Sequence, residues 1–188
     1  MFPDWSGRLA VCIASGPSLS AADCDLVRAS GHPVVVTNTT FRLCHWAQAL
    51  FGYDFAWWQA HIEEVRRVFS GKLYSKTART RNLGVSWVEQ DARFRPFCFS
   101  GACAVSLAIA AGAKRVVLLG HDMQFTGGKS HHHGNHPEGL KNCESMPTWA
   151  PQFARLARYA KQMGVDVVNA TRETALVSFE RRALESCL

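Results

Sequence analysis

The stretch LAVCIASGPSLS, residues 9–20, decides the predicted fold of this chain. Its first part, residues 9–14, is a short apolar run of the kind that forms a strand buried on both faces. Residues 15–18 then supply a Gly-Pro turn, and Ser20 is a typical N-cap for a helix that continues to about residue 30. A buried strand that leads directly into a helix is the repeating unit of a parallel α/β sheet.

The same alternation of strand and helix recurs along the chain. Further strands are predicted at 33–37, 49–53, 115–120 and 165–169, and further helices at 55–69, at 101–111 behind an N-cap at Ser100, at about 150–163, and from about Phe179. The polar, Arg-rich stretch 72–96 predicts surface loops, with room for one extra short strand. The sequence therefore predicts one Rossmann-like α/β domain over residues 1–188, with a mostly parallel sheet of five to six strands and helices on both faces.

Composition restricts the class of protein further. The chain has 47% hydrophobic and 19% charged residues, which is typical of a globular domain. The longest apolar run, residues 102–113, is too short to span a bilayer, and the N-terminus lacks a basic segment followed by a long apolar one. Seven scattered cysteines without a C-x-x-C pair predict reduced thiols, so we expect a cytoplasmic protein. The net charge of +6 favours an anionic partner.

Small polar residues and glycines follow the predicted strands, where the ligands of parallel sheets bind. Ser15-Gly16, Asn38, Ser100-Gly101 and Asp122 are the candidates for binding a nucleotide. Glycine allows close approach of the backbone to a ligand, the N-terminus of a helix suits phosphate, and an amide suits a base or a sugar. From these residues alone each also has a structural interpretation: a turn, an N-cap or a loop anchor.

Four further residues near strand ends have two interpretations each. Asp54 could bind a sugar hydroxyl or a metal, or could anchor a loop. Trp57 and Trp58 could stack on a base, although a core position is the commoner one. Arg172 could hold a phosphate or lie exposed in solvent.

The loop GGKSHHHGNHPEG, residues 127–139, is rich in histidine. A phosphate loop is excluded, because Met123 stands where that motif needs glycine and no helix follows Ser130. His132 and His136 have the i,i+4 spacing of helical metal ligands, but the neighbouring glycine and proline oppose a helix, so zinc binding is the less favoured alternative. Histidine is well suited to proton transfer near neutral pH, and this favours a catalytic loop.

Taken in order, "SGPSL", "TN", "SG", "LLGHDM" and "GNH" resemble the bacterial lipooligosaccharide sialyltransferases of glycosyltransferase family 42. The same motifs are similar to a related domain family that includes archaeal 6-hydroxymethylpterin pyrophosphokinases. The longer run "NTTFRL…WA…DFAWW…GHDMQ…H…GNHP…VVNATRETAL…F" resembles a group of phage and prophage proteins of unassigned function, for which the cytoplasm would be that of the host cell.

The resemblance to the sialyltransferases implies a site for the CMP part of a nucleotide-sugar donor, without an obligatory metal. The matching positions are Ser15, Gly16, Asn38, Ser100 and Gly101. It also implies that His136 is the general base that deprotonates the acceptor hydroxyl in an inverting transfer, with His131 as the second choice.

The chain departs from that family in three places. Ser15 and Ala14 stand where the family has Asn and Gly, and Met123, Gln124 and Phe125 stand where two tyrosines would steady the leaving phosphate. The resemblance therefore leaves the sugar and the nucleotide of the donor open.

Three functions follow as hypotheses. The first is a nucleotide-dependent transferase, most simply a glycosyltransferase-like enzyme with a histidine base, whose acceptor could be a glycan, a nucleic acid or a small molecule. The second is pyrophosphokinase-like phosphoryl transfer with Mg²⁺ held by Asp122 and Asp54. The third is a phage accessory protein that binds nucleic acid or a host protein through its basic surface. The oligomeric state is left open.

Overall fold

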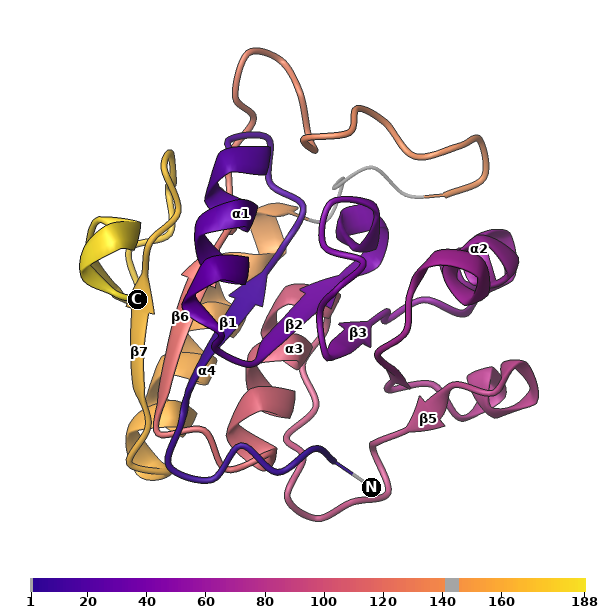
Figure 1. The fold of residues 1–188 in the computed structure, drawn as a ribbon, viewed down its shortest axis with the longest axis horizontal. Coiled ribbons are helices and arrows are strands. Elements are labelled where there is room, and N and C mark those ends of the chain that lie inside the picture. Colours follow the sequence, from indigo (N-terminus) through magenta and orange to yellow (C-terminus); the bar gives the residue numbers. More distant parts are fainter. Residues whose placement is uncertain (1, 141–145) are drawn as a thin grey trace.

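The computed structural model describes residues 2–140 and 146–188, which form an α/β domain around one parallel sheet (Figure 1). The sheet has eight strands in the order β5-β4-β3-β2-β1-β6-β7-β8. In chain order they are β1 (Leu9–Ile13), β2 (Val34–Thr37), β3 (Ala49–Phe51), β4 (Lys72–Ser75), β5 (Ser86–Trp87), β6 (Arg115–Leu119), β7 (Asp166–Asn169) and β8 (Glu180–Arg181). The predicted α/β class and parallel sheet are confirmed.

The strand order reverses between β1 and β6. The chain builds the sheet outward from β1 to β5, returns to the other side of β1 with β6, and continues to β8. β1 and β6 pair along their whole length, from Leu9 opposite Arg115 to Ile13 opposite Leu119. In open parallel sheets such a reversal leaves a crevice at the carboxyl ends of the strands.

Helices cover both faces of the sheet, as predicted. The helices α1 (Ala21–Ser30) and α2 (Phe55–Val68) pack on one face, and α3 (Ser100–Ala110) and α4 (Trp149–Gln162) pack on the other (Figure 1). Successive side chains of β1 alternate between the two cores: Val11 and Ile13 face α1 and α2, while Ala10 and Cys12 face α3 and α4. The central strands are therefore apolar at nearly every position, which is why they appear in the sequence as continuous runs.

Short helices complete the chain: η1 (Asn38–Arg42), η2 (Ala78–Leu83), η3 (Met146–Thr148) and η4 (Leu184–Ser186). The predicted start of α1 is confirmed, because the Ser20 hydroxyl accepts from the N–H of Asp23 and the Asp23 carboxylate accepts from Ser20 in return. No helix in the described part of the chain is both long and apolar enough to cross a membrane.

Three predicted elements differ from the structure. The helix expected from Phe179 is wrong: Glu180 and Arg181 pair with β7 as an edge strand, and only the short η4 follows. The sheet has eight strands rather than the predicted five to six. The prediction was too low because β4, β5 and β8 are short and lie toward the edges of the sheet. Ser100 is the first residue of α3 and not its cap; the N-cap is Phe99, which has no capping side chain.

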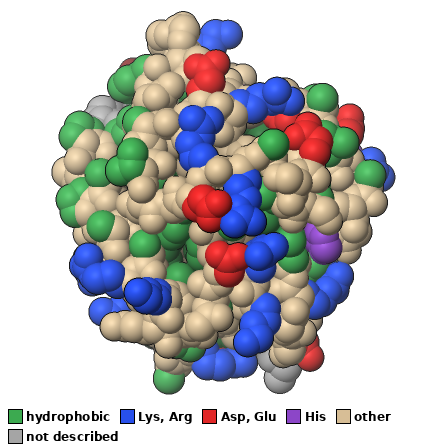
Figure 2. All heavy atoms as spheres, turned by 90° about the vertical axis from the view of Figure 1, so that its left-hand side faces the viewer, with side chains coloured by type: hydrophobic (Ala, Val, Ile, Leu, Met, Phe, Trp, Pro, Cys, Tyr) green, Lys and Arg blue, Asp and Glu red, His purple; other side chains and the backbone are tan. Residues whose placement is uncertain are grey.

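The excess positive charge is spread over the surface. Figure 2 shows one face of the molecule, on which Lys and Arg side chains are interspersed with Asp and Glu. Several arginines form ion pairs, for example Arg115 with Asp166 at 2.7 Å and Arg182 with Glu180 at 2.9 Å. Such exposed pairs add little stability, but they divide the charge into small, partly neutralised groups.

Gly16 is expected to be required for stability at the β1–β6 junction. Its N–H donates to the carbonyl of Gly120 at 2.8 Å, and a Cβ at this position would lie 2.0 Å from Asp122 Oδ1 and 2.5 Å from the Gly120 oxygen. We expect Gly16→Ala to lower the free energy of unfolding by roughly 1–3 kcal/mol, the usual cost of overpacking, as measured by urea denaturation.

Gly101→Ala is the matched control. A Cβ at Gly101 would meet no atom closer than 3.4 Å, and the residue lies in the first turn of α3. We expect this substitution to be neutral or stabilising, by at most about 1 kcal/mol. Equal losses from the two substitutions would show that the close approach at Gly16 is not what the junction depends on.

Candidate functional site

A cavity of about 390 Å³ lies at the carboxyl ends of β1, β2, β3 and β6. The segment after β6, drawn in orange at the top of Figure 1, passes over this edge of the sheet. The eight residues predicted from the sequence all line the cavity: Ser15, Gly16, Asn38, Ser100, Gly101, Asp122, His131 and His136. The structure thus brings together side chains from five separate stretches of sequence, and their roles remain predictions.

Ser100 joins three elements at the cavity wall. Its hydroxyl donates to Asn38 Oδ1 at 3.0 Å and accepts from the N–H of Tyr53 at 3.0 Å. These bonds connect the start of α3 to the residues that follow β2 and β3, and they fix the orientation of the Asn38 amide. Asn38 also has a left-handed backbone, with φ of 46°, a conformation that asparagine tolerates better than most residues and that often marks a functional site.

The N-terminus of α3 opens at the cavity. No side chain caps this helix, and Ser100 and Gly101 of its first turn line the cavity. The first N–H groups of a helix have no partner within the helix and carry a partial positive charge. Since Gly101 has no side chain to cover them, this turn is suited to bind an anion such as a phosphate.

Asp122 fastens the turn after β1. Its Oδ2 accepts from the N–H of Ser18 at 2.7 Å, so the loop-anchor interpretation is the one that the contacts support. The side chain is only 2% exposed, and burial raises the pKa of its carboxyl group to about 6. Its Oδ1 is buried without a hydrogen-bond partner among the described residues.

His121 and Tyr53 line the cavity but were not identified as site residues from the sequence. His121 is buried directly after β6; its Nδ1 lies 3.1 Å from the carbonyl oxygen of Leu119, so Nδ1 carries the proton and Nε2 is left as an acceptor. Burial lowers the pKa of this ring to about 4, which keeps it neutral at pH 7. Tyr53 lies after β3, and the Lys76 amino group donates to its hydroxyl at 3.4 Å. Their positions directly after strands were the only local signal.

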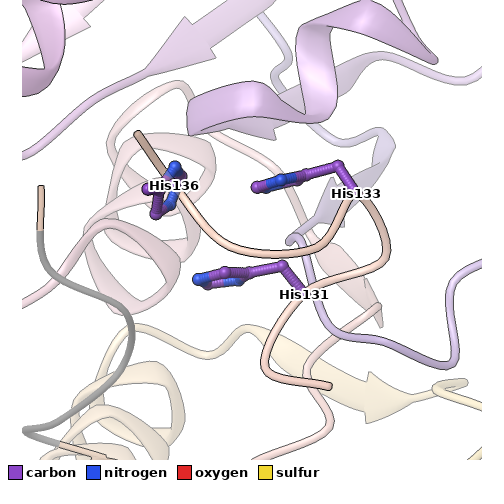
Figure 3. Close-up of side chains that lie close together, drawn as sticks. All are labelled: His131, His133 and His136. Atoms are coloured by element: carbon purple, nitrogen blue, oxygen red, sulfur yellow. The ribbon is translucent and has the colours of Figure 1, made fainter. Parts of the chain in front are cut away.

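The histidine loop is held by the end of β1. Ser15 Oγ lies 3.2 Å from His131 Nδ1, and the Ser15 carbonyl accepts from the N–H of His132 at 3.0 Å. The rings of His131, His133 and His136 form a triangle with centroids 4.7–5.0 Å apart (Figure 3). Burial lowers the pKa of His136, and it lowers the pKa of His133 to about 3. Burial therefore favours the neutral form of both imidazoles.

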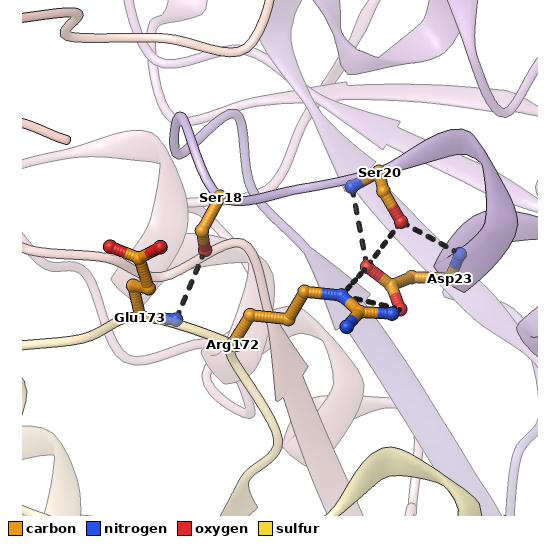
Figure 4. Close-up of polar contacts among 5 residues, drawn as sticks. All are labelled: Ser18, Ser20, Asp23, Arg172 and Glu173. Atoms are coloured by element: carbon orange, nitrogen blue, oxygen red, sulfur yellow. Dashed lines mark hydrogen bonds and ion pairs between the residues drawn. The ribbon is translucent and has the colours of Figure 1, made fainter. Parts of the chain in front are cut away.

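Arg172 lies outside the lining of this cavity. Its guanidinium forms a bidentate ion pair with Asp23, with N–O distances of 2.7–3.1 Å, and this pair ties α1 to the segment after β7 (Figure 4). Burial raises the pKa of Asp23, but the bonds from Arg172 and Ser20 outweigh it and hold that pKa below its ordinary value. The contacts make Arg172 a structural residue and not a phosphate ligand of the cavity.

The two tryptophans and Asp54 divide between core and cavity. Trp58 is fully buried, and its Nε1 donates to the carbonyl of Gly52 at 3.0 Å, which is the core position expected as the commoner one. Trp57 is also buried, yet it contributes to the cavity lining, as does Asp54.

The fold is similar to that of the sialyltransferase CstII from Campylobacter jejuni. The CstII structure with cytidine-5'-monophosphate gives a TM-score of 0.54 at 15% sequence identity, over 95% of this chain and 86% of that chain. The structure with CMP-3FNeuAc gives 0.50 at 15% identity, over 94% and 86%. No protein-family model and no curated protein matches the sequence. The resemblance to the sialyltransferases is therefore confirmed at the level of the fold.

Asp122 is expected to make stability depend on pH. Because its pKa is about 6 in the folded protein and near 3.8 in the unfolded chain, the folded state holds the proton more tightly. Below about pH 4 the carboxyl group is protonated in both states and does not change the free energy of unfolding. Between pH 4 and 6 its ionisation lowers the free energy of unfolding by up to about 3 kcal/mol.

Asp122→Asn removes this titration while keeping an oxygen that can accept from Ser18. Urea denaturation at pH 4, 5, 6 and 7 is expected to show the variant gaining stability relative to the wild type as the pH rises. Parallel pH profiles for the two proteins would contradict the raised pKa.

Proposed function

We propose that the protein is a nucleotide-dependent transferase of the glycosyltransferase type, which moves a sugar from a nucleotide-sugar donor to an acceptor hydroxyl. The observation that carries the proposal is the composition of a single cavity. One wall holds the open N-terminus of α3 with the small polar groups of Ser15, Asn38 and Ser100, and the same lining includes His131 and His136.

The nucleotide would bind at the carboxyl ends of the strands. The first turn of α3 would receive the phosphate, and the Asn38 amide would contact the sugar or the base. Neutral His121 would accept a hydrogen bond through Nε2 from an amino or hydroxyl group of the nucleotide. The structural relative was solved with cytidine-5'-monophosphate, and this supports a cytidine nucleotide as the first ligand to test.

His136 would act as the general base. It would take the proton of the acceptor hydroxyl while that oxygen attacks the anomeric carbon of the donor sugar, and the bond from that carbon to the nucleotide phosphate would break. His131 is the second candidate, because its Nδ1 is already engaged with Ser15.

The leaving phosphate needs a compensating group in place of the missing tyrosines after Asp122. Tyr53 would supply it, since its hydroxyl contacts Lys76 and its side chain contributes to the cavity lining. Together with the N–H groups of α3, this arrangement would stabilise negative charge without a metal.

Phosphoryl transfer with a divalent ion is the second candidate. The observation that favours it is that Asp54 and Asp122 line the same cavity. Carboxylate oxygens are the ligands that Mg²⁺ prefers, so this function would require Mg²⁺ for nucleotide binding or turnover.

Thermal-shift measurements with CMP, UDP and ATP, each with and without Mg²⁺, separate the two candidates. The proposed transferase predicts stabilisation by CMP or UDP that is independent of Mg²⁺. Stabilisation by ATP that requires Mg²⁺ would favour phosphoryl transfer, and no shift with any nucleotide would contradict both.

His136→Ala tests the base. With a sugar donor of the nucleotide that the panel identifies, we expect turnover to fall by about 10²–10⁴-fold while the nucleotide-induced thermal shift stays within a few degrees of wild type. His132→Ala is the matched control, because His132 belongs to the same loop but does not line the cavity. Full activity in His136→Ala would overturn the assignment of the base.

A further inference from the structure

Three imidazole rings of the histidine loop lie close together. The nearest ligand nitrogens of His131, His133 and His136 all lie within 4.8 Å of one another. Figure 3 shows the rings of His131 and His133 nearly parallel, both directed toward His136. Within the described residues, no other group of three or more His, Cys, Asp or Glu side chains converges in this way.

We propose that His131, His133 and His136 bind one transition-metal ion of the Zn²⁺ class. Neither the fold nor the transferase proposal requires such a site, and it arises from the geometry of the loop alone.

The cluster contains a polar atom that the protein leaves unsatisfied. Nε2 of His133 is buried and has no hydrogen-bond partner among the described residues. A buried nitrogen without a partner destabilises the folded state, and three imidazoles packed against one another gain less from burial than apolar side chains would. A coordinated metal ion would give this nitrogen a partner and would account for the convergence of the rings.

Ser15 orients one of the ligands. Ser15 Oγ lies 3.2 Å from His131 Nδ1, so Nε2 is the ring nitrogen that would coordinate an ion. Histidine ligands in metal sites commonly use their second nitrogen for such a hydrogen bond. Backbone bonds from His132 to Ser15 and from Gly134 to the His131 carbonyl hold the loop in shape. The ligands are therefore partly preorganised.

The ligand chemistry selects the ion. Three imidazole nitrogens suit Zn²⁺, Co²⁺, Ni²⁺ or Cu²⁺, whereas Mg²⁺ and Ca²⁺ prefer oxygen. Zn–N bonds of about 2.0–2.1 Å in a tetrahedral site place the nitrogens roughly 3.4 Å apart, so small rotations of the rings would complete the site. His131 and His136 line the cavity, so a fourth ligand would come from water or from a molecule bound there.

A bound ion would inhibit the transferase, and this consequence rests on the proposed function. The lone pair of His136 cannot both coordinate a metal and accept the proton of the acceptor hydroxyl. Metal binding itself does not depend on that function, so the two statements can fail separately.

Metal binding is tested on the tag-free full chain by calorimetry with Zn²⁺ and by visible absorption with Co²⁺. We expect one ion per chain, with tetrahedral Co²⁺ bands and no comparable binding of Mg²⁺. His133→Ala and the conservative His133→Gln should each weaken binding by at least about tenfold. Circular dichroism verifies that both variants are folded.

Two control variants make the assignment specific. His132→Ala removes a neighbouring imidazole outside the cluster, and Cys98→Ser removes the exposed thiol of the cavity lining. Both should bind Zn²⁺ as the wild type does. The absence of Zn²⁺ binding by the wild type, unchanged binding by both His133 variants, or loss of binding in either control would overturn the proposed site.

Turnover measurements separate this site from the function. Zn²⁺ should inhibit the wild type, and a chelator should reverse this inhibition. Zn²⁺ binding without inhibition would support the metal site and contradict His136 as the base. If the wild type binds no Zn²⁺ and His136→Ala loses turnover, the metal site is overturned and the assignment of His136 as the base is supported.

Discussion

The parallel pairing of β1 with β6 is the constraint on which the site depends. It places the turn at Ser15 beside residues more than a hundred positions later in the chain. The backbone of Gly16 bonds to Gly120, Ser18 bonds to Asp122, and Ser15 holds the histidine loop through both its hydroxyl and its carbonyl. The cavity is thus formed where the order of the strands reverses, and its wall includes the short segments that leave those two strands.

The core explains why this edge can be so polar. Apolar side chains on both faces of the central strands provide the stabilising burial, so the residues beyond the strand ends are not needed for packing. α3 fits this arrangement, because Ala102, Ala104 and Ala108 are fully buried and let the helix lie close to the sheet. Its N-terminus is then delivered to the cavity with no capping side chain, and the Ser100 hydroxyl instead joins Asn38 to Tyr53.

The sequence was informative where the signal was local. The apolar runs of the central strands, the capping box at Ser20 and the residues after each strand were sufficient to predict the sheet and to select residues that share one cavity. Edge strands were missed because β8, Glu180–Arg181, is polar and is defined only by its pairing with β7. The role of His121 in the cavity and the convergence of His133 with His131 and His136 could not be predicted from the sequence either. The orientation of these rings depends on contacts between residues distant in sequence.

Charge in the site comes from the backbone more than from arginine. Arg172 is held by Asp23 and Arg42 by Glu64, and neither lines the cavity. Burial favours the neutral forms of His121, His133 and His136, and the carboxyl of Asp122 adds no positive charge. An anion would therefore be stabilised by the N–H groups of α3 and by Tyr53 with Lys76. Dipoles that are fixed before the ligand arrives need little reorganisation, and this is the form of electrostatic stabilisation that a rigid strand edge can provide. The proposed phosphate ligand fits such a cavity better than the long, charged backbone of a nucleic acid would, since recognition of that backbone relies on many exposed cations.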